Sequence, residues 1–262
     1  MTGVSGVVLI AAAATLWIVV LQGVAFAVGH RIGRYNVVDV SWGLGLAGIA
    51  VLALVLGGGD PVRRVVLALV VGVWGLRLSW HMAGKTRGRG EDPRYRDYLG
   101  PQPGLLTVGG KVFGLQGLSQ LWVGLPLIVA AVEGGPSGWT WAVFALGLAG
   151  CLTGMVFEAV GDAQLRSYRR DPGRGPVLDT GLWAWTRHPN YFGDACVWWG
   201  VWLMAATGGY AALTVLSPIA MTYFLVYATG ARRLERMMAQ RPGYREYQRR
   251  TSYFVPRPPR RA

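Results

Sequence analysis

Fifteen consecutive residues, TGLWAWTRHPNYFGD at positions 180–194, combine side chains that rarely stand together in an apolar chain. Pro189 suits the first turn of a helix, so the charged and polar candidates fall just before that turn or inside it: Arg187, His188, Asn190, Tyr191 and Asp194. Free N–H groups at a helix N-terminus attract anions, and an arginine donates two parallel hydrogen bonds to a phosphate. The stretch therefore predicts an anion-binding site. The alternative is a capped helix start with interfacial aromatic residues, which does not require a histidine, an amide and an acid together.

A second candidate cluster precedes this stretch. Glu158, Asp162 and Arg169 recur at spacings of four and seven, which places them on one helix face. Two acids beside a basic run suit the hydroxyl groups of a ribose and the phosphates attached to it. A salt-bridged helix end is the alternative reading.

The basic segment ARRLERMMAQRPGYREYQRRTSYFVPRP near the C-terminus interleaves arginines with acids and aromatic residues. Its candidates for binding are Glu235, Arg236 and Tyr247. Two readings stay open: a solvated tail that faces lipid headgroups, or a lid over a bound nucleotide.

Two further groups of polar residues lie within apolar runs. Asn36, Asp39 and Trp42 follow a three-residue spacing on one face, and a second face carries Trp74, Arg77 and His81. Ionisable groups at membrane depth are costly, and each is therefore a candidate for function. The alternatives are helix capping for Asn36 and Asp39, and an Arg77 side chain that reaches the interface.

The elements that must position these residues are membrane helices. The chain of 262 residues is 52% hydrophobic and only 15% charged. A helix needs ~20 apolar residues to cross a bilayer. Such runs predict an all-α bundle of seven transmembrane helices, at roughly 7–29, 38–57, 62–83, 112–132, 139–160, 192–207 and 210–230. No soluble domain fits between these spans, so we expect one integral membrane domain over residues 1–262 with a C-terminal segment at 231–262.

The net charge of +13 is distributed unevenly. Lysine and arginine gather in alternate loops and after the last predicted span, which is the positive-inside pattern. We therefore expect a multi-pass protein of the cell inner membrane with its N-terminus outside and its C-terminus in the cytoplasm. The same distribution favours anionic membrane lipids as partners and argues against nucleic acid. Cys151 and Cys196 have no second thiol at metal spacing, so no metal site is expected.

Four stretches give the chain a resemblance to the steroid 5α-reductase superfamily, most closely to a bacterial branch catalogued as a domain of unknown function. They are NVVDVSWGLG, WGLRLSWH followed by GEDPRYRDY, TGLWAWTRHPNYFGD, and RPGYREYQRRTSYFVP. The resemblance implies a seven-helix bundle that holds NADPH and passes a hydride to an activated carbon–carbon double bond of a steroid-like lipid. It also implies that Asp162, Arg169, Asn190 and Asp194 bind the nucleotide.

The chain departs from the steroid enzymes at the catalytic end. Those enzymes place a Gln-Glu pair in the second helix and a tyrosine near the third, whereas this sequence offers Val38-Asp39 for the pair and Arg77 or His81 near the tyrosine. Asp194 and Glu158 stand where those enzymes have a glutamate and an amide. RHP-x-Y with Glu235 and RPGYREY also resembles isoprenylcysteine-type membrane methyltransferases, which use S-adenosylmethionine.

We therefore expect an NADPH-dependent oxidoreductase that acts on a CH–CH group of a bilayer lipid. Negative charge develops on a distant carbonyl oxygen during hydride addition, and preorganised donors stabilise it. A protonated Asp39 assisted by Arg77 or His81 is the expected donor, with Asn36, Trp42 and Trp74 against the substrate. The alternatives are the methyltransferase and a non-catalytic membrane protein.

Overall fold

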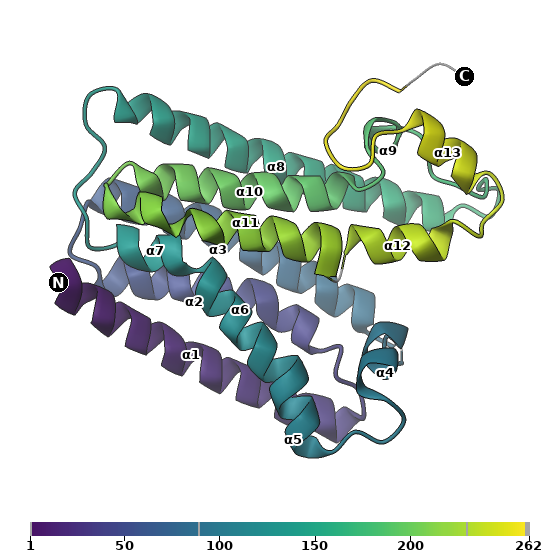
Figure 1. Ribbon diagram of the computed structural model, residues 1–262, viewed down its shortest axis with the longest axis horizontal. Helices are drawn as coiled ribbons and strands as arrows, with labels where there is room; N and C mark the ends of the chain where they lie inside the picture. The colour runs from purple at the N-terminus through teal and green to yellow at the C-terminus, as the bar shows by residue number, and fades with distance from the viewer. Residues whose placement is uncertain (1, 89, 229, 260–262) are drawn as a thin grey trace. The chain divides into compact units, whose positions relative to one another are not determined.

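The computed structural model describes residues 2–88, 90–228 and 230–259. Helices joined by loops make up the described chain (Figure 1). Helices account for 76% of the chain, and no strand occurs in the described ranges. Five helices are long and apolar enough to cross a membrane: Gly3–Ile32, Val38–Leu56, Pro61–Thr86, Thr140–Arg170 and the composite stretch Tyr210–Met238. The all-α, multi-pass prediction is therefore supported at this coarser level.

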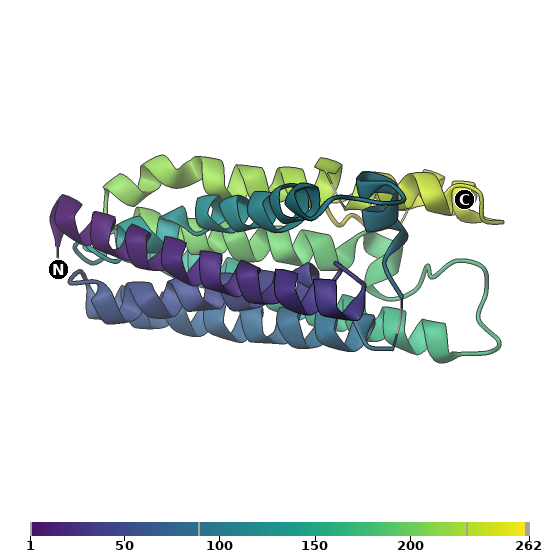
Figure 2. The same cartoon turned by 90° about the horizontal axis from the view of Figure 1, so that it is seen from below.

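The chain divides into two compact units, the first formed by Met1–Trp141 with Met204–Thr214 and the second by Ala142–Leu203 with Val215–Ala262. The long helices of the first unit are α1 (Gly3–Ile32), α2 (Val38–Leu56) and α3 (Pro61–Thr86), which run side by side (Figures 1 and 2). Its shorter helices are α4 (Pro93–Leu99), α5 (Leu105–Val108), η1 (Gly109–Gly114), α6 (Leu115–Val123) and α7 (Leu125–Ala130).

Glycines allow α2 and α3 to approach closely. A Cβ on Gly43 would overlap the carbonyl of Gly75, and a Cβ on Gly75 would overlap the carbonyl of Gly43. Ser79 then donates a hydrogen bond of 2.7 Å to the carbonyl of Val40 across the same contact. Small residues at membrane helix contacts gain van der Waals packing where lipid gives no hydrophobic drive. This contact fixes the first turn of α2, which carries Asp39.

A buried arginine ties residues 204–214 to the rest of the first unit. The Arg63 side chain is fully buried, and its Nη2 donates to the carbonyls of Ala130 (2.8 Å) and Glu133 (3.0 Å). The Glu133 carboxylate in turn accepts a 3.1 Å hydrogen bond from the backbone N–H of Ala211. Gly208 packs against the tips of both side chains, where a Cβ would overlap them.

The second unit contains α8 (Thr140–Arg170), α10 (Pro189–Ala206), α11 (Leu216–Tyr223), η3 (Phe224–Ala228), and the short helices α9 (Leu182–Trp185), α12 (Ala231–Met238) and α13 (Tyr244–Arg250). The helix η2 (Tyr210–Val215) leads into α11. Gly154 and Gly193 bring α8 and α10 together, since a Cβ on either would overlap the other's carbonyl. Trp183 and Leu182 attach α9 to α8 through hydrogen bonds to Gly161 and Gln164.

The expectation of seven spans is not confirmed, because two of the predicted helices are not among the five apolar candidates. The run 112–132 is divided into η1, α6 and α7, with the break between the last two at Gly124. Pro126 in the first turn of α7 lacks the N–H that a continuous helix would use. The helix predicted at 192–207 begins at Pro189, so its first turns include Asn190 and Asp194 and lower its apolar content.

Candidate functional site

The Glu235 carboxylate in α12 contacts polar side chains from two other segments of the second unit, residues 187–188 and α13. Its Oε1 accepts hydrogen bonds from Arg187 Nε (2.9 Å) and Tyr244 Oη (2.8 Å), and it lies 3.1 Å from His188 Nε2. Its Oε2 accepts a 2.6 Å hydrogen bond from Gln248. Glu235 and His188 are both buried. The RHP motif and the C-terminal segment, separated by more than forty residues, therefore meet at one carboxylate; we call this set the Glu235 cluster.

Arg187 also holds the end of α13. Its Nη1 donates to the carbonyls of Gln248 (3.0 Å) and Thr251 (2.6 Å), and its backbone N–H donates to Ser252 (2.9 Å). A cation at the C-terminus of a helix satisfies the last carbonyls and suits the helix dipole. The sequence predicted a phosphate donor, whereas the structure places this guanidinium on Glu235 and on backbone oxygens. Arg187 is thus positioned to fix the C-terminal segment.

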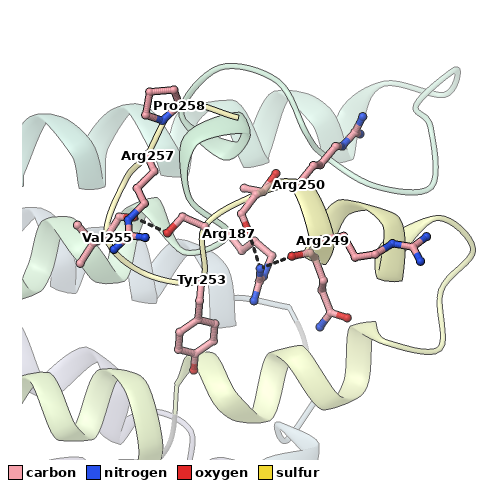
Figure 3. Close-up of a pocket in the computed structure, with 10 residues that line it drawn as sticks. Arg187, Arg249, Arg250, Tyr253, Val255, Arg257 and Pro258 are labelled. Atoms are coloured by element: carbon pink, nitrogen blue, oxygen red, sulfur yellow. Dashed lines mark hydrogen bonds between the residues drawn. The ribbon is translucent and has the colours of Figure 1, made fainter. Parts of the chain in front are cut away.

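The segment after α13 returns along residues 185–188. A parallel bridge joins Thr186 and Ser252, the Thr186 hydroxyl donates to the carbonyl of Phe254 (2.8 Å), and Arg257 N–H donates to the carbonyl of Trp185 (3.0 Å). A pocket of about 400 Å³ opens here (Figure 3), lined by Arg187, Gln248, Arg249, Arg250, Thr251, Ser252, Tyr253, Val255, Arg257 and Pro258. Four of these ten residues are arginines and none is acidic, so the lining favours an anion.

Aromatic rings surround His188. Its ring stacks on Tyr191 with centroids 5.8 Å apart and meets the edge of Tyr253 at 5.5 Å. The Arg187 guanidinium lies 5.3 Å from the centre of the Tyr253 ring. Tyr247, another predicted site residue, donates a 2.6 Å hydrogen bond to the carbonyl of Trp183. These contacts make the RHPNY stretch part of a packed aromatic and charged region.

The remaining predicted nucleotide residues lie along α8, α10 and α12. Asn190 donates a 3.3 Å hydrogen bond to Asp162, so the structure brings these two together across the α8–α10 contact. Glu158, Asp162 and Asp194 are buried, whereas Arg169 and Arg236 are exposed. No group of three potential metal ligands occurs among the described residues.

In the first unit, Asp39 is the centre of a second cluster. Tyr95 donates a 2.6 Å hydrogen bond to Oδ1, and Arg94 Nη2 lies 3.2 Å from Oδ2. Gln116 donates to the Tyr95 hydroxyl at 3.2 Å and accepts a hydrogen bond from the indole N–H of Trp42. A carboxylate, a phenol, an amide and a guanidinium thus meet at the first turn of α2; we call this set the Asp39 cluster.

The loop before α4 is anchored so that Arg94 and Tyr95 reach Asp39. Glu91 accepts hydrogen bonds from the backbone N–H groups of Tyr35, Asn36 and Asp92. Asp92 caps the N-terminus of α4 and pairs with Arg94 at 2.9 Å. The predicted residue Asn36 is buried and donates to the carbonyl of Gly90 at 3.1 Å, so it joins this loop to the start of α2.

The other predicted residues of the first unit lie on α3. Trp74 is fully buried, and Arg77 and His81 are partly exposed on the same helix. The described hydrogen bonds to Asp39 come from Tyr95 and Arg94, and the role of Arg77 and His81 stays a prediction.

Burial sets the protonation of three tyrosines outside the candidate spans. It raises the pKa of Tyr95 well above 10.0, and the adjacent charge of Asp39 raises it further. It also raises the pKa of Tyr244 and of Tyr247, where Glu235 contributes in the same direction. All three phenols therefore keep their protons at neutral pH and act as hydrogen-bond donors.

The sequence profile of a protein family of unknown function, DUF1295, matches residues 25–251. The chain belongs to this family. A search of curated proteins and a search of solved structures found no match. The matched range of the DUF1295 chain includes both the Asp39 cluster and the Glu235 cluster.

Sequence reasoning missed five members of these clusters: Arg94, Tyr95, Gln116, Tyr244 and Gln248. Arg94 and Tyr95 lie in the motif GEDPRYRDY, and Tyr244 and Gln248 lie in RPGYREYQRR. These motifs indicated functional segments, but they did not indicate which residues these side chains would contact. Gln116 carries no such signal, because its link to Tyr95 depends on how α4 and α6 of this DUF1295 chain pack around α2.

Proposed function

We propose that this protein is an NADPH-dependent membrane reductase that transfers a hydride to an activated carbon–carbon double bond of a steroid-like or other bilayer lipid. The proposal follows the resemblance to the steroid 5α-reductase superfamily. The observation that carries it is the Asp39 cluster, in which a phenol and a carboxylate meet beside a guanidinium at the end of an apolar helix. These are groups that polarise the carbonyl of a conjugated enone.

Tyr95 is the donor in this proposal. Asp39 accepts the hydrogen bond of the Tyr95 hydroxyl and lies 3.2 Å from Arg94, and burial keeps the proton on Tyr95, so the hydroxyl of Tyr95 is the group that can donate to a substrate oxygen. This hydroxyl turns about its C–O bond, and Gln116 holds its oxygen from the other side. Asp39 is assigned the role of positioning residue. The sequence alone gave the role of donor to Asp39.

The movement of electrons during hydride addition determines which substrate atom Tyr95 must donate to. When a hydride adds to the β-carbon, the electrons of the double bond move to the carbonyl oxygen, and the α-carbon then takes a proton from solvent. The enolate oxygen is the atom that needs a donor, and one such donor in a site shielded from water contributes several kcal/mol, about 10²–10³ in rate. Trp42, Asn36 and Trp74 are assigned to substrate contact, and Arg77 and His81 to assistance.

The donor set of the second unit fits a dinucleotide. Asp162 and Asn190 present a carboxylate and an amide suited to ribose hydroxyls, and Arg169 and Arg236 suit phosphates. When bound, NADPH supplies the hydride. We assign nucleotide contacts to Glu158, Asp162, Arg169, Asn190, Tyr191, Asp194 and Arg236.

The Glu235 cluster is assigned a positioning role. Arg187 and His188 share one carboxylate oxygen of Glu235, and through it they hold the segment that carries Tyr244 and Tyr247. These side chains orient the segment, and any contact that they make with the nucleotide is secondary in this proposal.

A methyltransferase that uses S-adenosylmethionine is the second candidate. The meeting of RHP-x-Y with Glu235 and Tyr244 is the observation in its favour, because these are the residues on which that resemblance rests. The Asp39 cluster favours the reductase, since methyl transfer to a thiolate or carboxylate develops no oxyanion for Tyr95 to stabilise.

The finer topology belongs to the same proposal: seven spans in the inner membrane, with the N-terminus outside and the basic loops in the cytoplasm. Titration of the purified chain in detergent with NADPH, NADH and S-adenosylmethionine tests the cofactor. Lipid extracts incubated with protein and NADPH, then compared by mass for a gain of two hydrogens, test the reaction. Binding of S-adenosylmethionine with no binding of NADPH would reverse the order of the two candidates.

A further inference from the structure

We propose that the arginine-lined pocket beside α13 binds the phosphate-bearing headgroup of an anionic membrane lipid. The pocket lies on the segment that follows the last candidate span, Tyr210–Met238, so it begins within about ten residues of a membrane helix end. Arg187, directly before α10, also lines it. Phosphates of lipid headgroups are the anions that occur at that depth.

The charges around the pocket favour an anionic lipid headgroup as its occupant. Arg249 and Arg250 extend from one wall, and Arg257 and Val255 lie on the other (Figure 3). The acids that pair with two of these arginines, Glu246 with Arg249 and Asp179 with Arg250, stand outside the lining. The Arg249 side chain is 76% exposed, so it can turn toward a bound group.

The floor of the pocket is a buried side chain, whereas its rim is exposed. Arg187 has only 10% of its side chain exposed and is held by Glu235 and by two carbonyls at the end of α13. A buried cation at the base and exposed arginines at the mouth suit a headgroup that enters from one side.

Apolar side chains continue the pocket outward. Val255 is 54% exposed on the rim, and Trp185, whose carbonyl accepts from Arg257, is 47% exposed. An exposed tryptophan beside arginines is typical of residues at the membrane interface. The glycerol and first methylenes of a lipid would contact these side chains, whereas a free phosphate would not. Headgroup contact is one of the two readings that the sequence leaves open for this segment.

The test uses the full chain in neutral detergent. Native mass spectrometry counts bound short-chain phosphatidylglycerol for the wild type, for Arg249→Gln/Arg257→Gln, and for a control pair of equal charge change, Arg31→Gln/Arg87→Gln. Both control arginines are exposed at helix ends of the first unit. We expect the pocket pair to lower the phosphatidylglycerol affinity by about tenfold or more and the control pair to leave it within about twofold.

Two further measurements identify the molecule that carries the bound phosphate. Zwitterionic phosphatidylcholine and inorganic phosphate should bind weakly and equally to all three proteins, and the NADPH affinity of the pocket pair should stay within about twofold of the wild type. Equal loss in both variant pairs, or an unchanged phosphatidylglycerol affinity in the pocket pair, overturns the proposal. Loss of NADPH binding in the pocket pair assigns the pocket to the nucleotide and also overturns it. Failure of the wild type to bind NADPH contradicts the proposed function. The phosphatidylglycerol measurements still test the lipid site in that case.

Discussion

At the scale of single residues, the partners of Asp39 define the candidate chemistry. The sequence placed Asp39 on one helix face with Asn36 and Trp42, and the resemblance to the steroid enzymes added Arg77 or His81 as its assistants. Its described hydrogen-bond partners, Arg94 and Tyr95, come from a segment more than fifty residues away. Packing of α4 against α2 creates this contact, and no periodicity encodes it.

The first prediction concerns Tyr95→Phe. The change removes the hydroxyl that Asp39 and Gln116 hold, so turnover of a lipid enone should fall by about 10²-fold or more while the NADPH affinity is retained. Stopped-flow oxidation of NADPH measures the turnover. Tyr98→Phe is the matched control, because Tyr98 lies on the same short helix and is 52% exposed. Equal activity of the two variants contradicts the role of Tyr95.

Alkaline pH should destabilise the fold through the buried tyrosines. Burial raises the pKa of Tyr95, Tyr244 and Tyr247 in the folded state above the ordinary value of 10.0. The stability that they contribute is fully present below pH 10 and is lost as the pH rises from there toward the folded-state pKa values. Thermal unfolding at pH 8, 10 and 11 measures this loss. The decrease between pH 10 and 11 should be smaller in Tyr244→Phe than in wild type, and an unchanged decrease would argue against this tyrosine.

At the scale of elements, the Glu235 cluster converts two distant motifs into one structure. The sequence indicated RHPNY and RPGYREY as separate candidates, and the structure joins them because α12 and α13 bring Glu235 and Tyr244 to Arg187 and His188. The phosphate role expected for Arg187 from its place before Pro189 stays a prediction, whereas its contacts with Glu235 and with the end of α13 were not expected. Position before a helix gives proximity to its N-terminus, but it does not give the direction of a long side chain.

Glu235→Ala should therefore release the C-terminal segment. The change leaves the buried Arg187 guanidinium without its carboxylate, and breaking a buried charged pair costs about 3–5 kcal/mol. Limited trypsin digestion followed by intact mass should show faster cleavage at residues 241–250. Glu246→Ala removes an exposed partner of Arg249 and should leave the cleavage rate near that of wild type. Equal protection of Glu235→Ala and wild type would contradict the clamping role.

At the scale of the whole molecule, composition predicted a helical membrane protein, and five of its seven predicted spans coincide with helices long and apolar enough to cross a membrane. A hydropathy count treats 112–132 as one run, but Gly124 and Pro126 divide it into α6 and α7. The same count predicts a membrane span at 192–207, although the helix begins at Pro189 and includes Asn190 and Asp194. Where a helix starts depends on its local turn, and the number of apolar residues in a window does not record this.

Long-range polar contacts also contribute to the stability of the first unit. Arg63→Ala removes the donors to two buried carbonyls, those of Ala130 and Glu133, and each unmade hydrogen bond costs about 1–3 kcal/mol. The apparent melting temperature in detergent should fall by about 5 °C or more. Arg96→Ala, at an exposed position on α4, should shift it by less than about 1 °C. Similar melting temperatures for Arg63→Ala and wild type would show that this arginine is dispensable.

The most direct measurement of the central claim is calorimetric titration of the purified chain with NADPH, repeated with Asn190→Ala and Asp194→Ala. We expect saturable binding of NADPH to the wild type and no binding of S-adenosylmethionine. Both variants should lose NADPH affinity by about tenfold or more and should keep the melting temperature of the wild type. Absence of NADPH binding by the folded wild type, or equal affinity in all three proteins, would contradict the central claim.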